Sequence, residues 1–342
     1  MSNRRESPPA TTPAKYRFRA CLTGLALATI CLSSRCTQGQ DLNFTAVRAE
    51  VDFGSRLREW DGFGFNYVET AQTRDYSSQP QDYGGLSLLS EDDRREIIDL
   101  VFGDDGLRCG LLKMFLDPFH QDEPGGKYDH ARTTQWMRYF AREGVKKARQ
   151  SGRDVSIITT LYGPPAYMTR QKTLRGRDLD PAHKSDLVHY VVDWVRYLRQ
   201  TEGLPVRYVS LHNEGEDWRR WTKAGLTDRP SHDYNLFWPP EQVTEFIPLL
   251  SSALKEAGLA DVGVTCGEPT NWYRFDAWGY ADAITDDSDA LRQLALITSH
   301  GFYSGTYGQW FGEHKSAGID KLRALRPDLH AWVTSTSWSQ MD

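Results

Sequence analysis

From about residue 50 onward, short apolar or β-branched runs alternate with longer stretches of helical period, and this alternation limits the possible folds most strongly. Repeated strand–helix units of this kind build a parallel sheet that is covered by helices. We expect seven strands, at Gly62–Asn66, Leu111–Asp117, Val155–Thr160, Val206–Glu214, Val262–Glu268, Leu294–Phe302 and Leu329–Ser335. They begin several tens of residues apart, as in a (β/α)8 barrel with elaborated loops.

Three of the stretches between these runs carry clear helix signals. Ser90 is followed three residues later by Asp93 and then by apolar residues, which predicts a capped helix. Apolar side chains recur at helical spacing over 187–198 and again over 243–254, and a glycine follows each stretch within five residues. These helices fill the places that a barrel of βα units requires.

The same alternation is compatible with an open, doubly wound sheet, and the polar residues decide between the two. A barrel places its chemistry at the carboxyl ends of many strands, whereas an open sheet concentrates it at one switch point. Here a polar residue ends or follows each run: Asn66, Asp117, Tyr162, Glu214, Glu268, His300 and Ser335. No glycine-rich phosphate loop supports the open sheet. We therefore predict a TIM-type (β/α)8 barrel that is truncated after the seventh strand.

Residues 1–40 have the pattern of an export signal and linker. Lys15, Arg17 and Arg19 precede an apolar stretch from about Cys21 to Leu32, which is too short to span a bilayer. We expect an exported protein, periplasmic, extracellular or lipid-anchored at the cell surface, with residues 41–342 as its catalytic-type domain.

Charge and cysteine usage exclude several function classes. Residues 41–342 carry 35 basic and 45 acidic side chains, which argues against a nucleic-acid or anionic-membrane partner. Cys109 and Cys266 lie in apolar runs and are expected to be buried thiols. The nine histidines form no zinc-binding spacing and there is no nucleophile-elbow motif, so we expect neither a metal nor a cofactor.

The strongest local signal is the adjacent pair Asn213-Glu214 at the end of a strand of apolar character. Glycosidic cleavage needs a carboxylic acid in a partly apolar setting, which keeps it protonated, and a nearby amide can hold the sugar 2-hydroxyl. We expect Glu214 to be partly buried, with its pKa raised by desolvation.

The segment from His189 to Glu214 resembles the fourth βα unit of glycoside hydrolase family 30, retaining barrel enzymes that include glucosylceramidases and glucuronoxylanases. Other strand ends resemble the same family in consistent order: Asp61–Gly64, Thr160–Met168, Gly267–Trp272, His300–Tyr303 and Trp332–Ser335. The resemblance covers about residues 50–338 and implies retaining cleavage of a β-linked glycoside or polysaccharide.

In that family the glutamate after the fourth-strand asparagine is the general acid/base, which maps to Glu214, with Asn213 as its sugar-binding neighbour. The seventh strand of the family ends in the nucleophilic glutamate, where this chain has Ser335. A retaining mechanism needs two carboxylates about 5 Å apart, and a hydroxyl does not replace one of them. The eighth βα unit and the C-terminal part of the family's side β-domain are also missing, so we expect a truncated frame or fragment of doubtful activity.

Further substrate-binding candidates are taken from the strand ends. They are Lys113, Asp117, Tyr162, Glu268, Trp272, His300, Tyr303 and Trp332, of which the four aromatic residues are expected to line one concavity around Glu214. Alternatives remain open at this point: a Lys113–Asp117 buried ion pair, a core role for His300, and an inverting mechanism using Glu214 with Glu268. The whole domain could also be a glycan-binding pseudoenzyme without catalysis.

Overall fold

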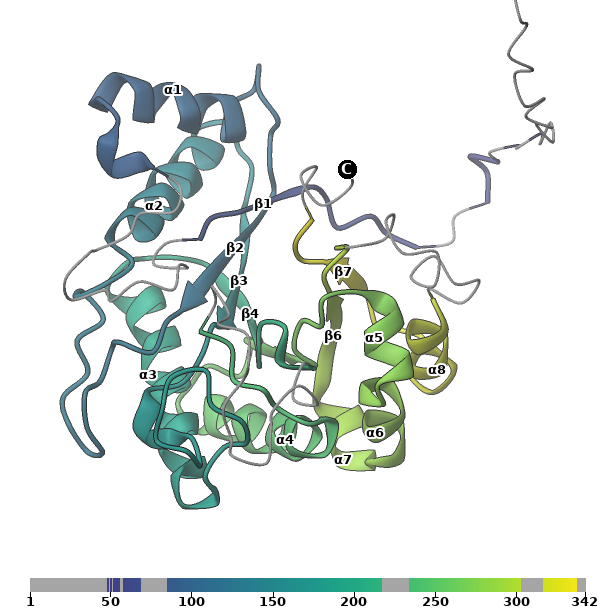
Figure 1. Ribbon diagram of the computed structural model, residues 1–342. Helices are drawn as coiled ribbons and strands as arrows, with labels where there is room; N and C mark the ends of the chain where they lie inside the picture. Colours follow the sequence, from purple (N-terminus) through teal and green to yellow (C-terminus); the bar gives the residue numbers. More distant parts are fainter. Residues whose placement is uncertain are drawn as a thin grey trace, which may run out of the picture. The chain divides into compact units, whose positions relative to one another are not determined.

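Seven parallel strands form one sheet in the computed structural model, and each strand pairs with its neighbour in the chain from β1 to β7 (Figure 1). The strands are β1 Gly64–Asn66, β2 Leu111–Leu116, β3 Ser156–Leu161, β4 Val206–Ser210, β5 Gly263–Thr265, β6 Leu294–Ser299 and β7 Ala331–Val333. A doubly wound sheet would reverse its strand order at a switch point, and this sheet does not. The seven-stranded, barrel-type fold is therefore confirmed, with most strands shorter than predicted.

The structure describes residues 48, 50, 52–55, 58–68, 85–216, 234–302 and 316–336. The chain divides into two units, residues 1–57 and residues 58–342, and all seven strands belong to the second. The predicted export signal lies outside the described residues. Among the helices that are described, none has the length and apolar character needed to cross a membrane.

Helices flank the curled sheet (Figure 1). They are α1 Glu91–Phe102, α2 Gln135–Gln150, α3 Lys184–Gln200, α4 Pro240–Glu256, α5 Trp272–Ala277, α6 Tyr280–Asp286, α7 Ser288–Gln293 and α8 Ala317–Leu325. The three helices predicted from sequence signals are α1, α3 and α4. The expected capping box is present, because Ser90 Oγ accepts from the Asp93 amide and the Asp93 carboxylate accepts from the Ser90 amide.

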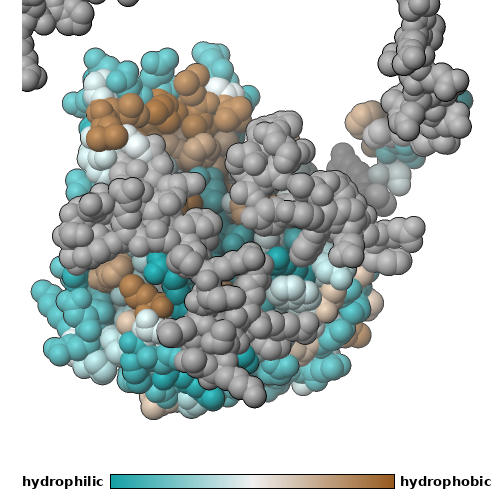
Figure 2. All heavy atoms as spheres, in the orientation of Figure 1, coloured by the Kyte–Doolittle hydropathy of each residue, from teal (hydrophilic) through white to brown (hydrophobic). Residues whose placement is uncertain are grey.

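Each of these helices buries its apolar face. Trp194 of α3 is fully buried and its indole Nε1 donates to Thr159 Oγ1 of β3 at 2.8 Å, so this helix is joined to the sheet by a specific contact as well as by packing. Helix α1 buries Val101 and Phe102 but leaves Leu100 exposed. Figure 2 shows hydrophobic surface near α1, at the upper left of the view, and a mainly hydrophilic surface elsewhere on the coloured part of this face.

The first and last strands of the sheet approach each other through side chains. Asn66 Nδ2 donates to Ser335 Oγ at 3.0 Å, and Trp332 Nε1 donates to Asp61 Oδ2 at 2.7 Å. Within the described residues no backbone ladder joins β1 to β7. A cavity of about 650 Å³ is lined by β1, β7 and the start of β2. The sheet thus curls toward closure without completing a backbone-bonded barrel.

Candidate active site

Glu214 lies in the turn that follows β4, and its backbone is unusual. Its φ of 46° places it in the left-handed region, which glutamate rarely adopts. The Glu214 amide donates to the Glu268 carbonyl at 2.8 Å, and the Glu268 amide donates to the His212 carbonyl at 2.9 Å. The segment after β5 therefore holds this conformation in place. Strained backbone that is held by its surroundings is frequent at functional sites.

The Glu214 side chain is half-buried, with 23% of its surface exposed, and its Oε1 lies 3.1 Å from His300 Nδ1. Burial alone would raise the pKa of the Glu214 carboxyl. The hydrogen bond from His300 and the positive charges of His300, Arg274 and Lys113 outweigh burial, and the pKa is lowered. The expectation of a raised pKa is therefore wrong for the free protein, because cations surround this carboxylate.

Glu268, by contrast, has no exposed surface and is fully paired. It forms a buried salt bridge with Lys113, accepts from Thr160 Oγ1 at 2.6 Å, and lies 3.0 Å from His300 Nε2. Although burial raises the pKa of the Glu268 carboxyl, the Lys113 charge and the bonds from His300 and Lys113 lower it far below its usual range. Glu268 is thus an ionised carboxylate inside the protein.

His300 joins the two carboxylates through its two ring nitrogens. Burial and the Lys113 charge lower its pKa, but the hydrogen bonds to Glu214 and Glu268 raise it, and the net direction is upward. We call Lys113, Glu214, Glu268 and His300 the carboxylate cluster. Its members come from β2 and from the segments that follow β4, β5 and β6, so it forms only when the curled sheet brings the ends of these four strands together.

Two residues that sequence reasoning missed support the Glu214 turn. Glu216 is fully buried and accepts from the Thr270 amide at 2.8 Å and from Arg274 Nη1 at 3.0 Å. This pair ties the turn after β4 to the start of α5. The only sequence signal was a second glutamate two residues after Glu214, and such a spacing does not separate a buried glutamate from a solvated one.

Ser335 lies beside the carboxylate cluster at the end of β7. Its carbonyl oxygen accepts from the amide of Gly301 at 2.8 Å, directly after His300 in the chain. Its hydroxyl oxygen accepts from Asn66 Nδ2. Ser335, Asn66 and Lys113 all line the 650 Å³ cavity, so the cavity reaches a member of the cluster.

Asn213 and Asp117 are buried among partners outside the carboxylate cluster. Asn213 Nδ2 donates to Asn235 Oδ1 at 3.0 Å. Asp117 has no exposed surface, accepts from the Phe119 amide at 2.8 Å, and lies 3.4 Å from His120 Nε2. The alternative of a Lys113–Asp117 ion pair is wrong, because the Lys113 ammonium reaches Glu268 across the sheet.

The structure describes three of the four aromatic residues that were expected to line one concavity around Glu214. Tyr162 is buried against Phe115, and Trp272 is half-buried against Phe275. Trp332 lines the 650 Å³ cavity and packs against the Tyr208 ring with centroids 5.1 Å apart. Tyr303 lies outside the described residues.

The part of the chain that the structure describes contains no group of three or more metal-ligating side chains suited to hold an ion. Cys109 and Cys266 are buried free thiols, as expected. The carboxylate cluster supplies two carboxylates, an imidazole and an ammonium group.

No protein-family model and no curated protein matches the chain. Among solved structures, an endo-β-1,6-glucanase is similar, with a TM-score of 0.60 and 17% sequence identity over 84% of this chain and 59% of the glucanase. The chain has a glycoside hydrolase fold. The fold that the sequence motifs implied is thereby confirmed.

Two further solved structures show the same likeness of fold. SrfJ from Salmonella typhimurium has a TM-score of 0.62 at 15% identity, over 80% of this chain and 56% of SrfJ. A conserved exported protein from Bacteroides fragilis has a TM-score of 0.61 at 17% identity, over 83% of this chain and 61% of that protein. The chain thus spans somewhat less than two thirds of the length of these proteins.

Proposed function

We propose that this chain is an exported glycoside-hydrolase-type domain that binds a β-linked glycoside or polysaccharide, with Glu214 as the general acid/base of a retaining mechanism. The observation that carries the proposal is the contrast within the carboxylate cluster. Glu214 is 23% exposed, whereas Glu268 is fully enclosed. Of these two carboxylates, only Glu214 is accessible to a bound glycosidic oxygen while it stays hydrogen-bonded to His300.

The enclosure of Glu268 argues against an inverting pair. In an inverting enzyme the second carboxylate must activate a water molecule next to the sugar. Glu268 instead pairs with Lys113, Thr160 and His300 inside the protein. We assign it the role of a positioning residue that holds His300 against Glu214.

Ser335 occupies the place of the family's nucleophile in this proposal. Among the described residues, the Ser335 hydroxyl oxygen accepts a hydrogen bond from Asn66 Nδ2. An amide nitrogen of this kind cannot act as a base that takes the hydroxyl proton. A serine without a neighbouring base is a poor nucleophile at neutral pH. We therefore infer that the chain binds its glycan but turns it over only weakly, and that binding alone is the second candidate function.

The neighbouring proteins suggest the substrate class and the location. One of them is named for cleavage of a β-1,6-glucan, and another is named as an exported protein. The basic and apolar pattern of residues 1–40 supports export of this chain as well.

The test uses an aryl β-glucoside with a dinitrophenyl leaving group, which departs without acid assistance. We expect near-background release of dinitrophenol, a clear increase with azide or formate, and a larger increase in Ser335→Glu. Ser335→Ala, as the matched control, should respond to azide like the parent. Turnover that is full without additive and unchanged in Ser335→Ala would overturn the assignment of Ser335, and a folded Ser335→Glu variant with no gain would favour glycan binding alone.

A further inference from the structure

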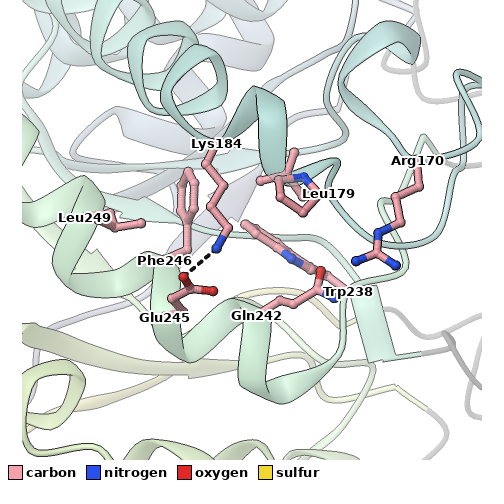
Figure 3. Close-up of a pocket in the computed structure, with 9 residues that line it drawn as sticks. Arg170, Leu179, Lys184, Trp238, Gln242, Glu245, Phe246 and Leu249 are labelled. Atoms are coloured by element: carbon pink, nitrogen blue, oxygen red, sulfur yellow. Dashed lines mark hydrogen bonds and ion pairs between the residues drawn. The ribbon is translucent and has the colours of Figure 1, made fainter.

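A second cavity lies between the segment that leads into α3 and the first turns of α4 (Figure 3). Its volume is about 150 Å³, well above the ~10–15 Å³ that one water molecule needs. Leu179, Phe246 and Leu249 supply apolar walls. No residue of the carboxylate cluster lines this cavity, so an inference about it does not depend on the proposed function.

Two polar side chains of this cavity have buried atoms with unmet hydrogen-bonding capacity. Trp238 is 1% exposed, and its indole Nε1 has no hydrogen-bond partner among the described residues. The same holds for Gln242 Oε1, although Gln242 Nε2 donates to Asp178 Oδ1 at 3.1 Å and so fixes the amide orientation. Both side chains line the cavity, one with an unmatched donor and the other with an unmatched acceptor, and buried groups of this kind normally have a partner.

A cation also lines this cavity. The Arg170 side chain is exposed, and its guanidinium forms no ion pair or hydrogen bond with the residues that the structure describes. Lys184 is already paired with Glu245 on the other side of the cavity. Figure 3 shows the Arg170 guanidinium and the end of the Gln242 side chain on the same side of Trp238. The uncompensated charge at this position is thus positive.

We propose that this cavity binds a small hydroxycarboxylic acid. The carboxylate would pair with Arg170, because a guanidinium offers two parallel donors that fit its two oxygens. A hydroxyl group would accept from Trp238 Nε1 and donate to Gln242 Oε1, which satisfies both unmet atoms with one ligand group. The carbon chain would lie against Leu179 and Phe246. A three- or four-carbon acid matches the small volume.

The binding test follows the indole ¹H–¹⁵N resonance of Trp238, which Trp238→Phe identifies by its loss. Glycerate carries both groups, glycerol lacks the carboxylate, and propionate lacks the hydroxyls. We expect glycerate to shift this resonance saturably with a Kd of about 1 mM. Glycerol and propionate should each bind roughly tenfold more weakly. Equal affinities for glycerate and propionate would overturn the hydroxyl contact.

Variants test whether the Arg170 guanidinium itself binds the carboxylate of the ligand. Arg170→Gln changes an exposed side chain and should weaken glycerate about tenfold while leaving glycerol unchanged. Arg149→Gln changes an exposed arginine of α2 that does not line this cavity, and this matched control should bind glycerate like the parent. No shift of the Trp238 resonance in tens of millimolar glycerate, or equal binding by Arg170→Gln and the parent, would show that the cavity holds water only.

Discussion

At the scale of single residues, Glu214 shows how a partly buried carboxylate is kept ionised. Burial opposes its charge, and the contact with His300 together with the surrounding cations reverses the effect. If Glu214 acts as a general acid, it must share its proton with the His300 imidazole, 3.1 Å away. Glu214 and His300 then titrate as a coupled pair.

Removing the imidazole should therefore raise the pKa of Glu214. In His300→Asn the burial of Glu214 remains while the charge and the strongest hydrogen bond are lost. We expect an upward shift in the titration of the Glu214 carboxyl carbon, followed by ¹³C NMR and assigned with Glu214→Gln. His330→Asn, a change on the half-exposed His330, is the control and should leave the titration in place. An unchanged pKa in His300→Asn would show that the imidazole is not what lowers the pKa of Glu214.

Buried neutral histidines should make the protein sensitive to acid. Burial lowers the pKa of His212 from 6.5 to about 3 and that of His130 to about 4. Below pH 6.5 the unfolded chain binds protons that the folded chain does not, so stability falls as the pH drops from 6.5 toward 4. At pH 5 each histidine costs about 2 kcal/mol of stability relative to pH 8.

The dependence on His212 can be isolated with His212→Asn. Asparagine has a side-chain oxygen that can accept from the Gly215 amide, as His212 Nδ1 does at 3.0 Å, but it does not titrate. Urea unfolding at pH 8 and pH 5 should therefore show a smaller loss for this variant than for the parent. Equal losses in the two proteins would mean that His212 does not contribute to the acid sensitivity.

At the scale of elements, the Glu216–Arg274 pair holds the turn after β4 against the start of α5. Both side chains are buried, so removing either partner leaves an uncompensated charge inside the protein. We expect Glu216→Leu and Arg274→Met each to lose about 3–5 kcal/mol of unfolding free energy. The double variant should lose clearly less than the sum of the two.

An exposed ion pair is the comparison for that double-variant cycle. Arg292 and Asp289 of α7 are both 64% exposed, and replacing either with alanine should change stability by less than about 1 kcal/mol. Additive losses for Glu216 and Arg274 would show that the two side chains are not coupled and that this pair does not support the Glu214 turn.

At the scale of the whole molecule, the contacts between the first and last strands determine how far the sheet curls. Asp61 Oδ2 accepts from Trp332 Nε1 at 2.7 Å and lies 2.6 Å from His330 Nδ1. Asp61→Ala removes both contacts, and we expect a loss of about 1–2 kcal/mol with faster amide hydrogen exchange in residues 329–336. Asp92→Ala changes an exposed carboxylate of α1 and should leave exchange in that segment unchanged. Unchanged exchange in Asp61→Ala would show that β7 is held by other contacts.

The sequence predicted the order and type of the elements well, because hydrophobic period is a local property. The seven strands, the capping box at Ser90 and the helices that became α1, α3 and α4 all follow from residues close together in the chain. The position of Asn213 and Glu214 shortly after β4 followed in the same way. Most predicted strands were too long at their carboxyl ends. Polar residues after a strand can continue the direction of the chain without joining the backbone hydrogen bonds of the sheet.

The partners of the charged groups were decided only by the tertiary structure. Lys113 pairs with Glu268, 155 residues later in the chain. The pair forms because the sheet curls and brings the side chain of Lys113 on β2 to that of Glu268 after β5. The same arrangement brings His300 between Glu214 and Glu268, encloses Glu268 and reverses the expected pKa shift of Glu214. Local sequence determines which side chains stand at the strand ends. The curvature of the sheet determines which of them meet, and electrostatic energy depends on those distances.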